Sequence, residues 1–419
     1  MTTIQKASAA TLPGLLALFF LYVNSIPSDT RLGPTSVAGV LTGMIAGLSL
    51  ALFPWLITLR ERRHVFDHQP WVRWLPAIWW FFLLWAVISL GRLFTIDGAQ
   101  NLAVWISFSF AVCAGAITTT PETVSWLLRN IRRAAWMTAV VYAATVAIDG
   151  PGTNILFGAR AYAWTALIFI AVLIAAPAKT KGNTLLPVFL VLMIGLTLSR
   201  TALALGLLLL VAIVLRGRRG TRAFKASLIL GGAAYASWEI VNKYEPLRKR
   251  FFEGDDAFQI GGVHLNTSGR MAFWEKLWDS AMIDPWFGRG LGSSVTVTSQ
   301  YYASFGTTQP HNDYIRLLHD LGWLGVIMFT VALLAVLRDA IGRASKAKTP
   351  LSRQIHTAAA LSLGVVLIAM ITDNMIIYPF VMIPVGVLLG VSIGTGSADT
   401  RSRTPGLKAQ KIKEAAARE

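Results

Sequence analysis

The sequence is poor in charged residues and almost free of cysteine. Charged side chains make up 14% of the 419 residues and hydrophobic ones 54%, whereas about a quarter of the residues in soluble domains are charged. The single cysteine, Cys113, lies in an apolar run, which excludes an internal disulfide or a cysteine-based metal site. The chain has neither an HExxH zinc motif nor an Asp-x-Asp pair. We therefore expect chemistry that uses no metal ion and no cofactor.

What the chain does have is a long series of apolar segments separated by short basic loops. Each segment is close to the ~20 residues that a helix needs to cross a bilayer. Alternation with a period of two does not recur along the chain, so a helical bundle is favoured over a barrel. We predict an all-α polytopic membrane protein with about twelve transmembrane helices. The predicted spans cover residues 11–27, 36–59, 75–91, 101–118, 134–149, 161–177, 184–199, 201–215, 226–241, 321–337, 356–376 and 379–395.

The net charge of +17 is spread over the loops and does not form a nucleic-acid-binding patch. With twelve spans, 26 of the 38 Lys and Arg residues fall on one face, together with both termini. The positive-inside rule makes that face cytoplasmic. The predicted divisions are nine spans in 1–241, an outer loop domain in 242–320, three spans in 321–396 and a basic cytoplasmic tail in 397–419. We expect the tail to lie near anionic inner-membrane lipids.

The apolar tract from 184 to 215 is too long for one ordinary span. Polar residues interrupt it at 197–201, which predicts two short helices that meet at Arg200. An arginine between apolar helices is costly in a membrane, which favours an anion ligand in an aqueous cavity. The alternatives are a side chain that reaches the interface, or an ion pair with an acid such as Asp373.

Arg270 is predicted to lie in the first turn of a short helix at Gly269–Ser280. Because a helix N-terminus attracts anions, an arginine there does not serve helix stability. A guanidinium group can bind a phosphate with two parallel hydrogen bonds. An ordinary surface ion pair with Glu275 or Asp279 remains the alternative.

His311 follows Pro310 at the end of the outer loop and is expected to start the helix that leads into the next span. An imidazole titrates near neutrality and can accept a proton from a hydroxyl group. Asn312 and Asp313 are expected to set its tautomer or to accept a proton, and Asp373 is expected to pair with an arginine or shape the cavity. A purely structural histidine is the alternative.

Two further stretches of the outer loop are distinctive. The basic run Arg248-Lys249-Arg250 is either a solvated flank or a contact for the phosphates of an anionic glycolipid. The segment from Pro285 to Gly292 is rich in glycine but lacks the strand–turn–helix context of a phosphate-binding loop. A tight turn that folds the outer loop back onto the bundle is the favoured interpretation.

Taken together, these residues resemble the O-antigen ligase superfamily, which also contains O-antigen polymerases and O-linked oligosaccharyltransferases. The resemblance covers chiefly residues 195–330. Asp320 stands where the family usually has glutamate, and Ile315 stands where leucine is usual. The matching positions are Ser199-Arg200, Ser268-Gly269-Arg270 with Trp274, Pro285 with Gly288, Gly290 and Gly292, and His311-Asn312 followed by Gly322 and Gly325.

The resemblance implies a GT-C-type glycosyltransferase in the bacterial inner membrane, with its active site on the periplasmic side. It implies a glycan on undecaprenyl diphosphate as donor and lipid A–core oligosaccharide as acceptor. Arg200 and Arg270 would then bind the diphosphate, and His311 would act as base in an inverting, metal-independent displacement. These roles are expectations that come from the family.

Other functions stay open at this stage. An O-antigen polymerase or a protein O-oligosaccharyltransferase would share the same residues. The basic run at 248–250 favours a phosphorylated lipid acceptor, and therefore a ligase. A small-solute transporter has a similar number of spans, but it would show broken helices in two repeats and ionisable residues at the midplane.

Overall fold

The computed structural model describes five long stretches of the chain, which are residues 35–63, 75–176, 185–215, 270–300 and 309–401. Short pieces at 31–32, 243, 245, 259–260 and 263–264 are also described. Two small antiparallel hairpins lie outside the helices. In them, β1 (Arg31–Leu32) pairs with β2 (Thr35–Ser36), and β3 (Gln259–Ile260) pairs with β4 (Val263–His264).

The helices carry nearly all of the described structure. In chain order they are α2 (Val37–Arg63), α3 (Ala77–Arg92), α4 (Ile96–Thr118), α5 (Pro121–Asp149), α6 (Ala159–Ile174), α7 (Leu185–Leu196), α8 (Arg200–Leu215), α11 (Arg270–Ala281), α12 (Ser293–Ser299), α14 (Asp313–Lys346), α15 (Pro350–Ala369), the 3-10 helix η2 (Met375–Ile377) and α16 (Pro379–Arg401).

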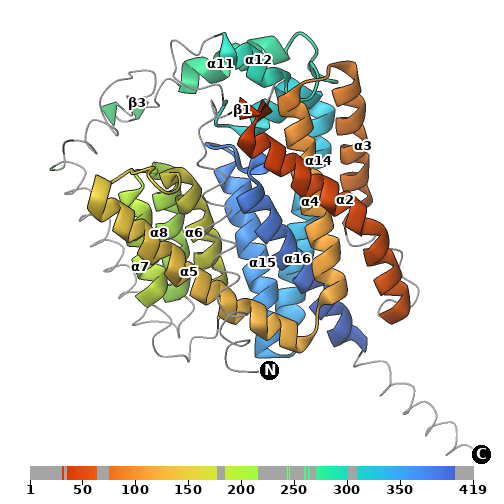
Figure 1. The fold of residues 1–419 in the computed structure, drawn as a ribbon, viewed down its shortest axis with the longest axis vertical. Helices are drawn as coiled ribbons and strands as arrows, with labels where there is room; N and C mark the ends of the chain where they lie inside the picture. Colours follow the sequence, from red (N-terminus) through yellow and green to blue (C-terminus); the bar gives the residue numbers. More distant parts are fainter. Residues whose placement is uncertain are drawn as a thin grey trace, which may run out of the picture.

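The helices form two groups that lie side by side, with a small layer across one end (Figure 1). One group holds α5, α6, α7 and α8. The other holds α2, α3, α4, α14, α15 and α16, and α6 packs against α15 to join the two. The end layer consists of α11 and α12, which pack on α14. Both helix groups contribute residues to the end of the bundle that this layer covers.

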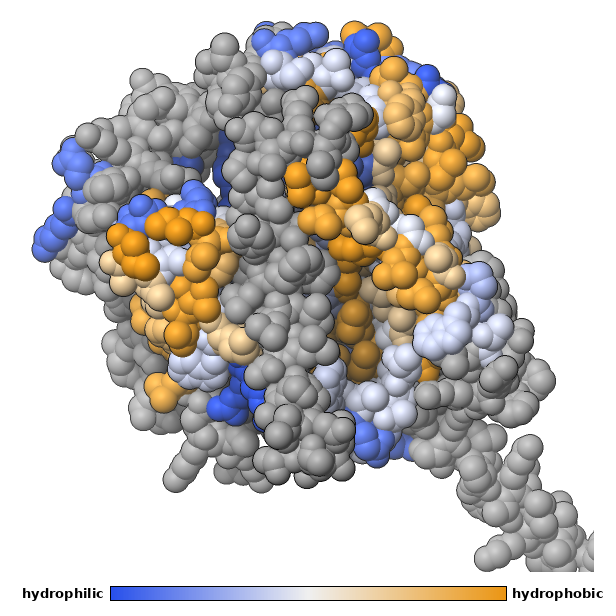
Figure 2. Space-filling model, viewed as in Figure 1, coloured by the Kyte–Doolittle hydropathy of each residue, from blue (hydrophilic) through white to orange (hydrophobic). Residues whose placement is uncertain are grey.

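Helix length and surface composition identify a polytopic membrane protein. Six described helices are long and apolar enough to span a bilayer: α2, α4, α5, α14, α15 and α16. The helices α3, α6, α7 and α8 are apolar but shorter. Large apolar side chains such as Phe81 and Leu192 are exposed, and Figure 2 shows apolar residues along the sides and polar ones toward both ends. The predicted spans 11–27 and 226–241 lie outside the described residues.

Two predicted boundaries were wrong. α5 begins at Pro121 and not near 134, because Thr120 and Thr123 form a capping box that starts a helix with a polar first half. α15 ends at Ala369, before the predicted 376, which leaves Asp373 in a turn. The helix expected to start near His311 and to lead into the span at 321 is α14, which begins at Asp313 after its cap Asn312.

The predicted break in the tract from 184 to 215 is confirmed. α7 ends at Leu196 and α8 begins at Arg200. Between them, Leu198 has a φ of 58°, a left-handed conformation that ends a helix. The Thr197 hydroxyl donates to Ile194 O at 2.6 Å and accepts from Ser199 N at 3.3 Å. The break therefore places Arg200 at the N-terminus of a helix near the end of the bundle.

The core between α3, α4 and α14 is aromatic. Trp79, Phe82, Trp105 and Phe329 are fully buried. The ring centroid of Phe82 lies 4.9 Å from that of Trp105 and 5.0 Å from that of Phe329. Buried indole N–H groups need acceptors. Trp105 Nε1 donates to the carbonyl of Ile376 at 3.1 Å, so this core also anchors η2 next to the polar site described below.

The glycine-rich segment after Pro285 is a tight turn that docks on α14, as the sequence predicted. Gly288, Gly290 and Gly292 all have positive φ. The N–H groups of Gly292 and Ser294 donate to the Asp320 carboxylate at 2.9 and 2.7 Å. A buried carboxylate of this kind is stable because several donors satisfy it. Asp320 thus joins the end layer to the first turns of α14.

The same turn explains a kink in α14 at Gly322. This residue has φ 70° and ψ −176°, a conformation that is essentially restricted to glycine. Trp323 N donates to Pro285 O at 2.8 Å, and Leu324 N donates to Trp286 O at 3.2 Å. A Cβ on Gly322 would lie 2.3 Å from the Trp286 carbonyl. The kink therefore leaves the N–H groups of Trp323 and Leu324 free of the helix, so that they bond to the turn. There is no room for a side chain at Gly322.

We expect Gly322→Ala to destabilise the protein by more than the about 1–3 kcal/mol of backbone strain alone, because the new methyl group also meets backbone atoms. Gly342→Ala is the matched control. It lies in the same helix, its Cβ would meet open space, and alanine favours the helix by up to about 1 kcal/mol. Thermal unfolding in detergent should give a lower midpoint for the first variant only. Equal midpoints for the two variants would contradict the role of the kink.

Candidate functional site

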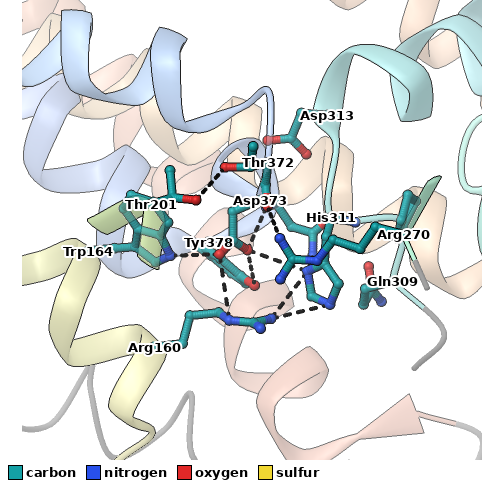
Figure 3. A network of polar contacts seen from close by, with 12 residues as sticks. Arg160, Trp164, Thr201, Arg270, Gln309, His311, Asp313, Thr372, Asp373 and Tyr378 are labelled. Carbon is teal, nitrogen blue, oxygen red and sulfur yellow. Dashed lines mark hydrogen bonds and ion pairs between the residues drawn. The ribbon is translucent and has the colours of Figure 1, made fainter. Parts of the chain in front are cut away.

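A polar network fills the space beneath the end layer, where the two helix groups meet. Arg160 and Trp164 come from α6, and Thr201 comes from the first turn of α8. His311 precedes α14, and Asp373 lies in the turn after α15. Figure 3 shows the guanidinium groups of Arg160 and Arg270 pointing toward the imidazole of His311. Side chains from residues 160 to 378 thus converge on one place.

His311 is held in an unusual backbone conformation. Its φ is 52°, which is uncommon for a residue other than glycine and needs support from its surroundings. That support comes from Asn374, whose Oδ1 accepts from His311 N at 2.9 Å and from Arg316 Nη2 at 2.9 Å. Because two donors meet this oxygen, the amide orientation is fixed, and Asn374 Nδ2 lies 2.7 Å from His311 Nδ1.

Asp373 is the acid of the network and is buried. Its carboxylate accepts from Trp164 Nε1 at 3.0 Å and from Asn374 N at 2.8 Å. It also lies 3.5 Å from Arg160 Nε and 3.5 Å from His311 Nδ1. Burial raises the pKa of this carboxyl, but Arg160, His311 and the Asn374 N–H together bring it below its ordinary value. Asp373 therefore stays ionised at neutral pH.

Arg160 joins the acid to the imidazole. Its Nη1 lies 3.2 Å from both ring nitrogens of His311. Burial lowers the pKa of His311, Asp373 raises it, and the Arg160 and Arg270 guanidinium groups lower it, with a net shift below the ordinary value. The imidazole is therefore neutral at neutral pH, which is the state that accepts a proton.

A cavity of about 400 Å³ opens beside this network and is lined mainly by polar groups. Arg160, Arg200 and Arg270 line it together with Asp373. Arg270 Nη1 also donates to the carbonyl of Thr372 at 3.0 Å. Among the described residues that line the cavity, three guanidinium groups lie with one carboxylate, so this part of the lining has an excess of positive charge. Such a cavity suits a ligand with more than one negative charge, such as a diphosphate.

The structure brings together three residues that the sequence singled out, Arg200, Arg270 and His311, and their chemical roles remain predictions. The supporting role predicted for Asn312 and Asp313 stays a prediction. Asn312 Oδ1 accepts from Tyr314 N and Ile315 N as the cap of α14. Asp313 Oδ2 accepts from Ile376 N at 3.0 Å. These contacts fix the backbone next to His311.

Sequence reasoning named Asn374 with Asp373 as a residue that pairs with an arginine or shapes the cavity, but it missed Arg160 as a site residue. Arg160 directly precedes the predicted span 161–177, where an arginine looks like an ordinary flanking charge. The available signal was that this span end and Asp373 were both assigned to the outer face. The basic run Arg248-Lys249-Arg250 lies outside the described residues. Among the described residues, no group of three or more His, Cys, Asp or Glu is placed to hold a metal ion.

The fold and the site define a class of protein before any comparison: a polytopic membrane protein with a cationic cavity and a neutral imidazole at one end of its bundle. Residues 185–330 match the family model described as O-antigen ligase. The resemblance to the O-antigen ligase family is thereby confirmed over this stretch. The match supports a membrane glycosyltransferase of the ligase and polymerase type. No curated protein matches the chain.

The matched stretch contains Arg200, Arg270 and His311 but not the other residues of the network. Arg160 precedes it, and Asp373 and Asn374 follow it. The contacts around the imidazole therefore depend on helices from both sides of the matched stretch.

We expect Arg160→Gln to raise the pKa of His311. The variant removes a cation beside the imidazole and leaves Asp373 to interact with the ring alone, so both effects favour the protonated form. NMR titration of ¹³C-labelled histidines would measure this pKa, with the His311 signal identified by its loss in His311→Gln. Wild-type His311 should titrate below its ordinary range. Arg289→Gln, which removes an exposed arginine bound to Ser280, should leave the value unchanged, and an equal shift in both variants would contradict the contact.

Proposed function

We propose that the protein is an O-antigen ligase that transfers a glycan from undecaprenyl diphosphate to the lipid A–core oligosaccharide. In this proposal it lies in the bacterial inner membrane as a GT-C-type enzyme, with the site facing the periplasm and both termini in the cytoplasm. The observation that carries the proposal is a cavity lined by three guanidinium groups, with the neutral imidazole of His311 in contact with Arg160 and Asp373 of its lining.

The donor diphosphate would bind in the cationic cavity. Arg200 is positioned by the start of α8, and Arg270 by the start of α11 and its bond to Thr372. Guanidinium groups can each bind two phosphate oxygens, which fixes the leaving group in direction as well as in place. Arg160 adds a third cation on the side of His311. The arginines would supply the counter-charge that a metal ion supplies in other diphosphate sites.

The transfer itself would be one displacement at the anomeric carbon of the donor sugar. His311 takes the proton from an acceptor hydroxyl, and the hydroxyl oxygen forms a bond to that carbon. The bond between the carbon and the diphosphate oxygen breaks at the same time, and undecaprenyl diphosphate leaves with the electron pair. Attack opposite the leaving group inverts the configuration. The imidazolium that forms would be stabilised by the Asp373 carboxylate, 3.5 Å from Nδ1.

Arg160 connects the two halves of this reaction. In the described structure its Nη1 lies against both nitrogens of the imidazole, so it disfavours a proton there. A diphosphate in the adjacent cavity offers the guanidinium a stronger partner than a neutral ring. Donor binding would thus draw Arg160 away from the base and let the ring accept its proton. The leaving-group charge that develops would meet guanidinium groups already in position.

An O-antigen polymerase or a protein O-oligosaccharyltransferase would use the same site, so the acceptor decides between them. The basic run at 248–250 favours a phosphorylated glycolipid acceptor. Purified protein should be incubated with a lipid-diphosphate glycan and lipid A–core, in the presence of EDTA. A ligase makes a new product on the core, whereas a polymerase lengthens the lipid-linked glycan.

We expect His311→Ala to remain in the membrane and to lose transfer, because it removes the neutral imidazole that contacts Arg160 and Asp373 beside the cavity. Loss of a general base costs about a hundredfold or more in rate. His356→Ala is the control, since His356 is buried against Ser392 in the other half of the bundle. Wild-type transfer by the first variant would remove the base role from His311.

Arg200→Lys keeps the positive charge but loses the fork of donors that fits two phosphate oxygens. We expect a rise in the donor KM or a fall in kcat of at least about tenfold, which corresponds to one charge-assisted hydrogen bond. The acceptor KM should not change. Arg289→Lys is the matched control outside the cavity, and equal kinetics of the two variants would argue against diphosphate binding by Arg200.

A further inference from the structure

A second cavity, of about 520 Å³, lies on the opposite side of the His311 network. Its walls come from α2, from the start of α4, from the residues around the start of α14, and from the end of η2 and the start of α16. Among the described residues, its lining shares no member with that of the cationic cavity. Its volume is within the range of ligand sites, about 300–1,000 Å³.

One wall of this cavity carries neutral amides and an acid. Asp97, Gln100 and Asn101 share one face of α4, because residues three and four apart lie together on a helix. Gln309 adds a third amide from the chain just before His311. The facing wall is α2, which contributes mainly apolar side chains and Thr42. A ligand here would meet hydrogen-bonding groups on one side and apolar surface on the other.

One buried donor in this lining lacks a hydrogen-bond partner among the described residues. Asn101 is 4% exposed, and its Nδ2 has no hydrogen bond. Arg316 is paired, because its Nη2 donates to Asn374 Oδ1 at 2.9 Å and its Nε lies 3.7 Å from Asp313 Oδ1. A buried donor without an acceptor costs about 1–3 kcal/mol. An amide donor of this kind beside the cavity fits a ligand with oxygen acceptors.

The wall between the two cavities is one side chain thick. Asn374 Oδ1 bonds Arg316, which lines the second cavity, and also bonds the backbone of His311. Tyr378 lines the second cavity, and its hydroxyl donates to Asp373 Oδ1 at 3.4 Å, while Asp373 lines the cationic cavity. The base therefore sits between a cationic cavity and one that is lined mainly by neutral groups.

We propose that the second cavity binds the acceptor, a hydroxyl-rich carbohydrate, with Asn101, Gln100 and Gln309 as its hydrogen-bonding residues. This inference rests on the proposed function. Asn374 joins the backbone of His311 to Arg316 of this cavity, so an acceptor bound there would lie close to the proposed base.

The chemistry of the lining selects the ligand class. Amides donate to and accept from neutral hydroxyl groups, and a carboxylate accepts from them, which suits the hydroxyl groups that a sugar presents. A second diphosphate is disfavoured, because Asp97 contributes a carboxyl and the guanidinium of Arg316 is already bound to Asn374 and Gln309. The apolar wall of α2 suits the carbon face of a sugar ring.

Cysteine protection would test this assignment. Thr42→Cys reports on the second cavity and Ser199→Cys on the cationic one, each in a Cys113→Ala background, since Cys113 is the only native cysteine. Each protein in detergent is labelled with a small maleimide, alone, with purified lipid A–core, or with undecaprenyl-diphosphate glycan. With one substrate at a time, no transfer occurs and occupancy alone is measured.

At about ten times the dissociation constant, a bound substrate should slow labelling about tenfold. We expect lipid A–core to protect position 42 and not 199, and the donor to protect position 199 and not 42. Protection of position 42 by the donor would give this cavity to the polyprenyl chain and overturn the proposal. Failure of lipid A–core to protect position 42, while wild-type protein makes the ligated product, would overturn it too.

A kinetic measurement covers the case in which the cysteine variants fold poorly. Asn101→Ala should raise the acceptor KM about three- to tenfold, the effect of one neutral hydrogen bond, and leave the donor KM unchanged. Arg200→Lys should show the opposite pattern. An unchanged acceptor KM in Asn101→Ala contradicts the acceptor cavity alone, whereas the absence of ligated product from wild-type protein contradicts the proposed function itself.

Discussion

The ionised carboxylate of Asp373 is the contact on which the site depends. It is 3% exposed, so it must be paired to remain charged, and its partners come from different parts of the chain. Trp164 and Arg160 bind it from α6, while Asn374 binds it from the adjacent residue. A single buried anion thus draws one helix group against the other. It also keeps Arg160 beside His311, which sets the protonation state of the imidazole.

The excess of positive charge in the cavity is sustained by helix ends. Arg200 and Arg270 are each the first residue of a helix, where the macrodipole opposes a cation. An arrangement that is unfavourable for each helix alone becomes favourable when an anionic ligand occupies the space between them. In the proposed function, that ligand is the diphosphate of the donor.

The sequence was sufficient to predict the helical class, the break at Arg200 and the docking of the glycine turn, because each depends on local patterns. The apolar tract of α7 and α8 is too long to be one span, and the glycines at 288–292 have no other obvious use. The pairing of Asp373 with an arginine was also anticipated, but with Arg200 as partner. Arg160 was missed because its contacts to residues 311 and 373 join segments that are far apart in sequence.

The start of α14 next to His311 was expected, but the burial of charged residues in its first turns was not. Arg316 and Asp320 look like exposed residues, since buried charges are rare. They are buried here because the end layer and Asn374 provide partners for them. A hydrophobicity pattern reflects the cost of burying these charged side chains, but it does not show the distant partners that offset this cost. The positive φ of His311 is likewise supported by the side-chain amide of Asn374, far away in sequence. The residues next to His311 therefore do not predict it.

The docked glycine turn has a mechanical consequence. Peptide hydrogen bonds tie it to residues 319–324 of α14, on both sides of the kink, and His311 lies just before the start of the same helix. The end layer and His311 are therefore attached to one helix. In the proposed reaction, any widening that admits two lipid substrates would then come from the opposite wall, which is formed by α6 and α8.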